Sequence, residues 1–303
     1  MTGGWRVLAG ALLLSALAVA PASAEAVPAC GSWGFVELPV PQAVRSGGVV
    51  SGAGSYAVGN GSFWSADGST VLVWKDGQLA DQLSFSRNTT RAVDVNSSGV
   101  VVLSAYTFPA ASRWQAGAYE ALQGLPGEYR VEALDVNERG DVLGRSDGKP
   151  VVWPAGSAVP HRVPGADASF EPVGIADDGS VLVSSSGGAQ WVRPAGVVPL
   201  GDVRVSAVRG SYAVGVAGSE VVRWDLAGVA SEPFGGVSEA VAVNSHGHVL
   251  ARSAWGDTAV FEEPGRGVPV SGGVAFASLT DDGDLYGAVG TSPVLFECAG
   301  GVR

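Results

Sequence analysis

The chain has 303 residues, 46% of them hydrophobic, and a formal net charge of −11 at pH 7. An acidic surface repels phosphate groups, so the composition excludes nucleic acid and anionic membranes as partners. The 45 glycines favour an all-β protein with many tight turns.

The N-terminal segment predicts a secretory signal. An apolar run over 7–20 is followed by Pro21 and the small residues 22–24, which are typical of a cleavage site. The run is shorter than the ~20 residues that a membrane-spanning helix needs. We therefore predict a signal peptide over 1–24, a single mature domain over 25–303, secretion, and no membrane insertion after cleavage.

Two cysteines lie near the two ends of the mature chain, Cys30 and Cys298. An even number of cysteines in a secreted protein favours a disulfide. Closing a loop of roughly 270 residues would stabilise the fold by about 5 kcal/mol on chain entropy alone. The alternative is lipidation of Cys30, because residues 27–30 loosely resemble a lipobox; Glu25 and Pro28 separate Cys30 from the apolar run and disfavour it.

The mature chain is organised as repeats. In the best-marked one, 131–156, three short apolar strands are separated by turn residues, and a fourth strand is expected over 158–163. A bulky aromatic residue ends the third strand of every repeat: Trp74, Trp114, Trp153, Trp191, Trp224, Phe261 and Phe296. Successive markers are 33 to 40 residues apart. This spacing predicts a seven-bladed β-propeller of four-stranded antiparallel blades.

The turn between the first two strands supports the same register. It reads N-x-x-G or D-D-G in five repeats, because Asn, Asp and Gly tolerate positive φ angles. These turns are Asn96–Gly99, Asn137–Gly140, Asp177–Gly179, Asn244–Gly247 and Asp281–Gly283. Repeats one and five carry an identical hexapeptide instead, GSYAVG, at 54–59 and 210–215.

The two ends of the chain complete one blade. The seventh repeat stops after its third strand, 293–298, and the mature N-terminus offers a matching strand at 34–38. Pairing these strands would close the ring and leave no open seam. We expect no helix in the mature chain.

The repeat pattern resembles bacterial extracellular HAF repeats, a WD40-like class of β-propeller. The apolar-Trp-x-x-Gly ending is seen at 74–77 and 114–117, and the likeness covers nearly all of 35–298. The His-Ala-Phe triplet is replaced, for example by 149–151. The resemblance implies an extracellular propeller without a uniform activity.

Motifs for chemistry are few. The G-x-S-x-G match at 144–148 lies between two strands, whereas a nucleophile elbow needs a following helix. His246 and His248, at the first hairpin of repeat six, could ligate a metal or exchange protons. The acidic turns at 135–137 and 280–284 are explained by hairpins, because the closing carboxylate of a calcium loop is missing. We predict no catalytic set, metal or cofactor.

A charged ring is expected at the central channel. Arg91, Glu132 and Glu239 occupy one equivalent position, the start of the first strand, which lines the channel of a propeller. Ligands often bind at such mouths, so these residues, with His246 and His248, are the candidate ligand contacts.

The sequence favours a secreted, monomeric binding scaffold over an enzyme, because no repeat carries a convergent catalytic set. The partner would be a protein, peptide or glycan. Two alternatives stay open: a propeller enzyme, a metal-assisted lyase or hydrolase that uses the channel-mouth residues, and a passive cell-surface component.

Overall fold

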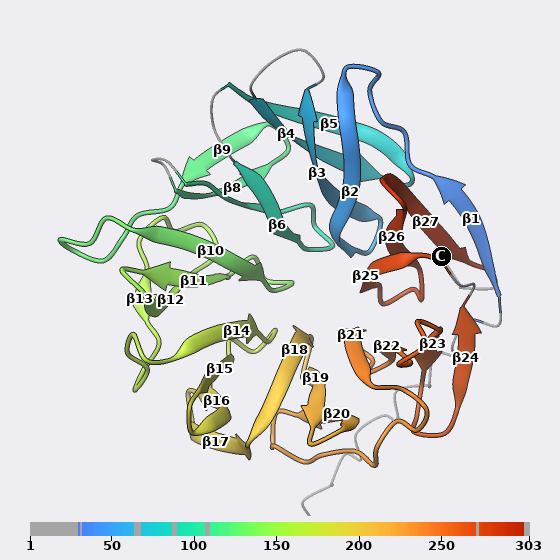
Figure 1. The fold of residues 1–303 in the computed structure, drawn as a ribbon. Coiled ribbons are helices and arrows are strands. Elements are labelled where there is room, and N and C mark those ends of the chain that lie inside the picture. Colours follow the sequence, from blue (N-terminus) through green and yellow to red (C-terminus); the bar gives the residue numbers. More distant parts are fainter. Residues whose placement is uncertain are drawn as a thin grey trace, which may run out of the picture.

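The structure is a computed structural model and describes residues 30, 32–63, 68–86, 90–106, 110–270 and 273–299. Seven small antiparallel sheets stand around a central axis in chain order, as Figure 1 shows. The prediction of a seven-bladed β-propeller is confirmed, and the described residues contain strands and turns without helix. It follows that none of these residues belongs to a helix able to cross a membrane. The predicted signal peptide lies outside the described residues.

Each blade is numbered by its order along the chain. The first three are β2 (Val44–Ala53), β3 (Tyr56–Phe63), β4 (Gly68–Lys75) and β5 (Gln78–Ser86); β6 (Arg91–Val95), β7 (Val101–Ser104), β8 (Ala111–Gln115) and β9 (Ala118–Ala121); and β10 (Val131–Val136), β11 (Val142–Ser146), β12 (Lys149–Trp153) and β13 (His161–Arg162).

The next three are β14 (Glu171–Ile175), β15 (Val181–Ser185), β16 (Gly188–Arg193) and β17 (Gly196–Gly201); β18 (Val203–Arg209), β19 (Tyr212–Ala217) and β20 (Glu220–Asp225); and β21 (Glu239–Val243), β22 (Val249–Arg252), β23 (Thr258–Phe261) and β24 (Gly267–Val270).

The last blade joins the two ends of the chain. It consists of β25 (Ala275–Leu279), β26 (Leu285–Val289), β27 (Ser292–Cys298) and, on its outer edge, β1 (Trp33–Glu37). In Figure 1 the blue β1 lies beside the red β27. Trp33 pairs with Cys298 and Glu37 with Val294. The predicted closure by an N-terminal strand is confirmed.

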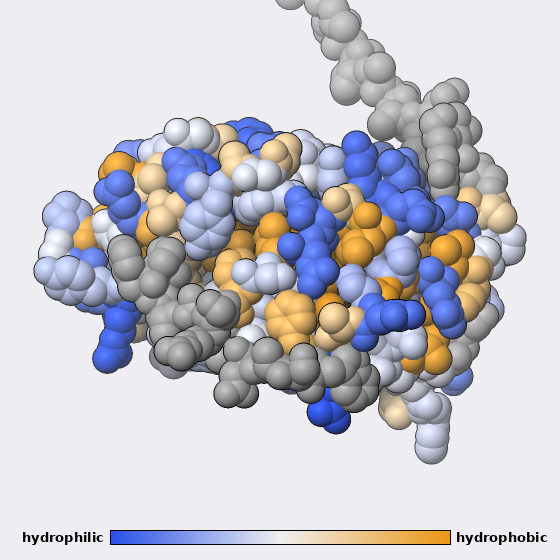
Figure 2. Space-filling model, turned by 90° about the horizontal axis from the view of Figure 1, so that it is seen from above, coloured by the Kyte–Doolittle hydropathy of each residue, from blue (hydrophilic) through white to orange (hydrophobic). Residues whose placement is uncertain are grey.

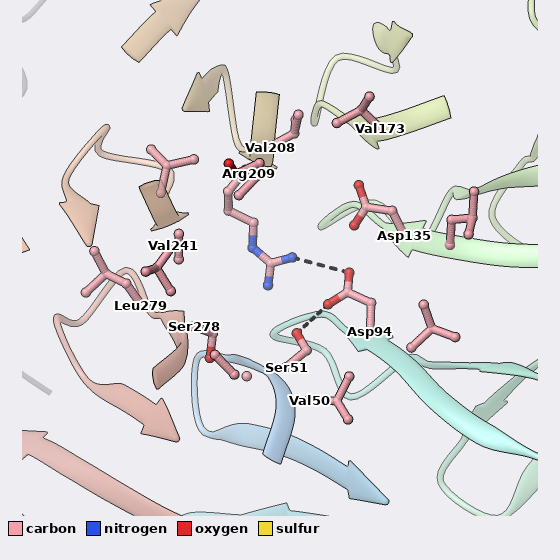
Figure 3. Close-up of a pocket in the computed structure, with 18 residues that line it drawn as sticks. Val50, Ser51, Asp94, Asp135, Val173, Val208, Arg209, Val241, Ser278 and Leu279 are labelled. Atoms are coloured by element: carbon pink, nitrogen blue, oxygen red, sulfur yellow. Dashed lines mark hydrogen bonds and ion pairs between the residues drawn. The ribbon is translucent and has the colours of Figure 1, made fainter. Parts of the chain in front are cut away.

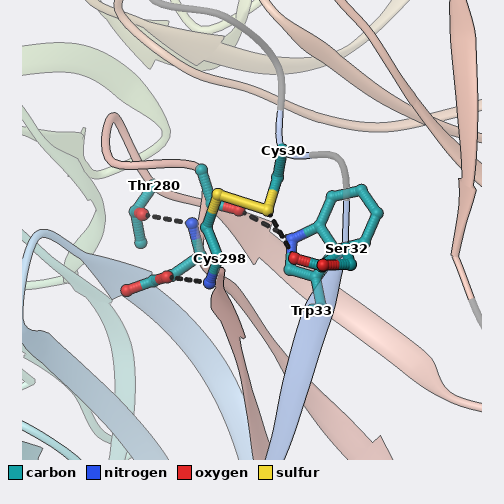
Figure 4. Close-up of a disulfide and its surroundings, with 7 residues drawn as sticks. Cys30, Ser32, Trp33, Thr280 and Cys298 are labelled. Carbon is teal, nitrogen blue, oxygen red and sulfur yellow. Dashed lines mark hydrogen bonds between the residues drawn. A yellow bond between two sulfur atoms is a disulfide. The ribbon is translucent and has the colours of Figure 1, made fainter. Parts of the chain in front are cut away.

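A disulfide locks this closure. Cys30 and Cys298 are bonded, with their Cα atoms 5.5 Å apart, at the end of the β1–β27 ladder where Cys298 pairs with Trp33 (Figure 4). The Trp33 Nε1 donates to the Gly283 carbonyl at 2.9 Å, and the Cys298 amide donates to Asp284 Oδ1 at 2.7 Å. The predicted disulfide is therefore confirmed. It links the segment that precedes the outermost strand, β1, covalently to β27 of the same blade.

The outer strands depart from the regular repeat in two blades. In the third blade the expected strand over 158–163 is reduced to β13, because Pro160 and Pro164 flank it and cannot donate to a ladder. The fifth blade forms three regular strands. A less regular segment occupies its fourth place through two isolated bridges, Val221 to Phe234 and Trp224 to Ala230.

The marker aromatics form the core between blades. All seven are buried. In the third blade Trp153 pairs with Val142, and its Nε1 donates to the Gln123 carbonyl at 2.9 Å. Trp191 is displaced by one residue from this pattern, because in the fourth blade it is Val192 that pairs with the equivalent valine, Val181.

The asparagine of the N-x-x-G turn links neighbouring blades. In Asn96, Asn137 and Asn244 the Oδ1 accepts backbone N–H groups of its own turn. The Nδ2 donates at 3.0 Å to a backbone carbonyl of the following blade, that of Asn137, Ala176 or Thr280. We call this arrangement the asparagine clamp. The turn signal seen in the sequence is therefore also an inter-blade contact.

The strand order defines two faces. The innermost strand of each blade begins at one face, here the start face, and ends at the hairpin face, where it turns into the second strand. The antiparallel order places the loops between second and third strands, and the connections between blades, on the start face. The hairpin face carries the other turns.

Candidate functional site: the central channel

The seven innermost strands line a central channel of about 220 Å³. All of them carry a β-bulge at the same position, so the lining falls into levels that can be compared between blades. From the start face inward these levels are a charged mouth, an aliphatic waist and a polar floor.

The mouth contains the charged residues that the sequence indicated. Arg91, Glu132 and Glu239 occupy the same register position, opposite Ser104, Arg145 and Arg252. Glu171 and Arg204 stand at this position in the fourth and fifth blades.

Ion pairs tie parts of this ring together. Arg91 lies 3.7 Å from Glu132 of the next blade, and Arg252 lies 3.4 Å from Glu239. Arg145 pairs with Glu171. The side chains of Arg91 and Glu132 are half-exposed, so they are available at the start face. Their contact with a ligand stays a prediction.

The waist is formed by the bulge residues. Five are aliphatic and of similar bulk, and the other two are smaller: Val50, Val93, Leu134, Val173, Val241, Ser206 and Ala277. A ligand that enters from the start face would pass through this apolar collar.

The floor is polar on one side only. Ser278, Ser51, Asp94 and Asp135 come from four consecutive blades, while Gly174, Ala207 and Ala242 occupy the same level in the other three. Figure 3 shows Ser51 bonded to Asp94, whose Oδ1 accepts the hydroxyl. Thus the small residues leave space opposite an arc of polar side chains.

The two aspartates also bridge blades through the backbone. Asp94 Oδ2 accepts the Val136 amide at 3.1 Å, and Asp135 Oδ2 accepts the Ile175 amide at 2.7 Å. Each carboxylate therefore binds the backbone of the following blade. These bonds hold the floor of the channel in a fixed arrangement.

Arg209 closes the channel toward the hairpin face. It stands where other blades carry the clamp asparagine. Its Nη2 donates to the Val95 carbonyl at 3.2 Å and its Nη1 to the Val136 carbonyl at 3.4 Å. The guanidinium lies 3.3 Å from Glu138 and 3.9 Å from Asp94 (Figure 3 draws the latter pair). Only 14% of the Arg209 side chain is exposed. We call this buried arginine at the hairpin-face end of the channel the plug.

The electrostatics of the floor are unusual. Burial, and next the nearby charge of Asp94, raise the pKa of Asp135 well above its ordinary value. Burial alone would lower the pKa of Arg209, but the carboxylates of Asp94, Glu138 and Asp135 outweigh this effect and raise it. It follows that Arg209 stays charged while Asp135 holds its proton more tightly than an exposed aspartate does.

The two histidines lie at the other end of the innermost strand. His246 and His248 follow β21 at the hairpin face, whereas Glu239 begins that strand at the start face. The structure therefore does not bring them to the mouth formed by Arg91 and Glu132. Their ring centroids are 5.9 Å apart; His246 is exposed, and burial lowers the pKa of the His248 imidazole.

Metal chemistry finds no support at these histidines. Within the described ranges, no group of three or more His, Cys, Asp or Glu side chains is arranged to hold a metal ion. The histidine pair would supply two ligands at most, while a catalytic zinc site takes three from the protein.

Sequence reasoning missed the floor and the plug. Asp94 and Asp135 both stand in a D-V-N tripeptide two residues before a clamp asparagine, a signal that aligning the repeats would have shown. Arg209 precedes one GSYAVG segment where Ala53 precedes the other. This difference between two otherwise matching repeats was the signal in the sequence that Arg209 has a separate role.

Comparison with known proteins shows the fold. No family model and no curated protein matches the chain. YCF48 from Cyanidioschyzon merolae is 13% identical with a TM-score of 0.57, covering 87% of this chain and 98% of that one. YCF48 bound to D1 peptide is 10% identical with a TM-score of 0.53, covering 90% and 98%.

A bacterial surface protein is also similar. PorZ, a surface component of the type-IX secretion system of Porphyromonas gingivalis, is 11% identical with a TM-score of 0.52, covering 88% of this chain and 38% of that one. At identities this low, the structural match shows a shared β-propeller architecture and nothing about function. The function must therefore be argued from the site.

Proposed function

We propose that this protein is a secreted interaction scaffold that binds a protein or peptide partner at its start face. The observation that carries the proposal is a set of exposed aromatic side chains in start-face loops. Tyr106, Tyr129 and Trp255 are 79%, 84% and 92% exposed. Tyr and Trp are enriched at interface hot spots, where their large rings become buried on binding.

One of these aromatic side chains, Tyr106, lies against the charged mouth. The Arg91 guanidinium lies 5.9 Å from the centre of the Tyr106 ring. Together with Glu132, Val131 and Ser104 these residues line a depression of about 210 Å³. An arginine beside an exposed aromatic ring and a small hollow is the composition expected for an anchoring point.

Figure 2 shows one side of the rim of the ring. The view is turned by 90° about the horizontal axis from that of Figure 1. Hydrophobic and hydrophilic residues are interspersed over the coloured surface. Single apolar residues of this kind are ordinary on a soluble protein. The start face, with its three exposed aromatic side chains, is therefore a better candidate for partner binding than this side of the rim.

Secretion and binding are supported by further features. The Cys30–Cys298 disulfide is typical of a non-reducing compartment. The repeats also resemble extracellular HAF repeats, of which this chain would be a divergent example. Among the similar folds, one binds a peptide and one is a surface component, which is analogy of fold.

The test is selection of peptides from a displayed random library against the disulfide-bonded protein. Peptides that bind should lose at least ~10-fold in affinity to Tyr106→Ala, as expected when an aromatic hot spot is truncated. Tyr119→Ala is the matched control, because Tyr119 lies on the outer strand β9 and is 47% exposed. Peptides equally sensitive to both changes, or to neither, would contradict the proposal.

A further inference from the structure

We infer that the central channel is a receptor pocket for a primary ammonium on an alkyl stem, such as the lysine side chain of a partner. This inference rests on the proposed function, since the partner would approach the start face. It goes beyond it by assigning the chemistry of one anchoring group and the residues that receive it.

The channel lining changes in character from the start face inward. The channel opens at the charged mouth, passes the aliphatic waist and ends at the polar floor, where Arg209 bars the way to the hairpin face. A methylene chain suits the waist, because apolar contact there removes hydrocarbon from water. A charged end group would then stop at the level of Asp94 and Asp135.

The floor holds more acidic side chains than cations, because Arg209 is shared among Asp94, Asp135 and Glu138. Arg209 lies closer to Glu138, at 3.3 Å, than to Asp94, at 3.9 Å. It donates its hydrogen bonds to two backbone carbonyls. Among the described residues, Asp135 has no cation within ion-pair distance. The carboxyl groups of Asp94 and Asp135 thus share part of one guanidinium and the proton that Asp135 retains, and an incoming ammonium would take the place of that proton.

An unpaired buried hydroxyl points to the same place. Ser278 lines the channel at the level of the aspartates and is 8% exposed, and its Oγ has no hydrogen-bond partner in the described structure. Buried polar groups in proteins are nearly always hydrogen-bonded, so an orphan in a pocket calls for a ligand or water. An ammonium carries N–H donors, and Ser278 stands at the same level of the channel as Asp94 and Asp135.

Other ligand classes fit less well. An anion would face two carboxylates. A quaternary ammonium has no N–H to give Ser278, and a metal ion would need a group of three protein ligands that the described residues do not form. The small volume of about 220 Å³ also suits a slender chain better than a broad ring.

The experiment measures binding of n-butylammonium, a mimic of the lysine side chain, by titration calorimetry and by protein NMR. We expect saturable binding, with the largest shifts for Ser278 and the waist residues. 1-Butanol, of the same length without charge, and tetramethylammonium, charged without donors, should each bind at least ~10-fold more weakly, because each loses one part of the recognition.

Asp135→Asn is the decisive variant. The amide is nearly isosteric, its oxygen can still accept the Ile175 amide, and its NH₂ can donate to Asp94 as the retained proton does. It should fold and yet lose at least ~10-fold in affinity for butylammonium, because an amide cannot release a proton to become the carboxylate that pairs with the ammonium. Asp282→Asn, which removes a carboxylate at an exposed site on the hairpin face, should leave the affinity unchanged. Equal loss in both variants would show bulk attraction to an acidic protein and overturn the inference, as would equal binding of 1-butanol.

The peptide selection separates this inference from the proposed function. If selected peptides need Tyr106 but tolerate Lys→Met at every lysine, and butylammonium does not bind, the scaffold stands and the pocket assignment falls. If butylammonium binds at Ser278 while no peptide is selected, the pocket stands as a small-amine site and the scaffold falls.

Discussion

The asparagine clamp makes a quantitative prediction for Asn137→Ala. Asn137 is 1% exposed and makes four side-chain hydrogen bonds. Its Oδ1 accepts the amides of Arg139 at 3.1 Å and Asp141 at 2.9 Å. Its Nδ2 donates to Asp141 Oδ2 at 3.1 Å and, in the next blade, to the Ala176 carbonyl at 3.0 Å. Alanine removes all four.

The expected loss follows from these bonds. A typical hydrogen bond contributes about 1 kcal/mol net, so four bonds give about 4 kcal/mol. The Arg139 amide lies in a partly exposed turn and can regain water, which lowers the expectation to about 3 kcal/mol. Asn137→Asp keeps the two acceptor bonds but loses both donors and places a carboxylate against Asp141. It should therefore destabilise by a similar amount at pH 7, and by less in acid.

The assay is urea unfolding followed by tryptophan fluorescence at pH 7 and at pH 4. Because Trp153 and Trp191 are buried in neighbouring blades, their emission reports the interface that the clamp spans. A loss below about 1 kcal/mol for Asn137→Ala would refute the reasoning, since it would mean that the clamp bonds are replaced at no cost.

Three further predictions concern the closure and the channel. Replacing Cys30 and Cys298 by serine should lower the free energy of unfolding by up to about 5.6 kcal/mol, the chain-entropy value for a sequence separation of 268 residues. A wild-type protein with the same urea midpoint under reducing and oxidising conditions would contradict this stabilisation by the disulfide. Arg209→Met should lower the free energy of unfolding by about 3–5 kcal/mol, because it removes the cation that pairs with Glu138 and Asp94. A thermal melt that matches that of the wild type would rule this out. Asp135→Asn should be stabilising at neutral pH. The pKa of Asp135 is raised in the folded state, so wild-type stability is highest below the pKa of the unfolded state and falls as pH rises through the pKa of the folded state, whereas the amide does not titrate. The melting temperature of the variant relative to wild type should therefore increase from pH 4 to pH 8, and a constant difference would show that Asp135 does not titrate as described.

Much of the fold could be predicted because each repeat carries its own strands, turn residues and marker aromatic within about 40 consecutive residues. The marker aromatics count the blades, and the missing fourth strand of the last repeat pointed to the N-terminal strand. Local exceptions were harder. The shift of Trp191 by one residue, and the irregular outer segment that ends at Phe234, depend on how neighbouring blades pack and have little trace in periodicity.

The candidate site was predicted in part. Arg91, Glu132 and Glu239 do share one level of the channel, because a repeat register read from turns carries over to the innermost strands. The histidine pair was grouped with them, although the innermost strand separates the two ends of the channel. Proximity along the chain to a channel strand does not say at which end of it a residue lies.

The sequence alone determined the seven repeats, the strands within them, the joining of the two ends and the pairing of the cysteines, since each is set by residue type at regular spacing. Only the tertiary structure decided what meets on the axis. Asp94, Asp135, Arg209 and Ser278 belong to four different blades and converge because ring closure brings every innermost strand to one line. The direction of the Arg209 side chain, toward carboxylates and carbonyls more than 70 residues away in sequence, is likewise a consequence of that closure.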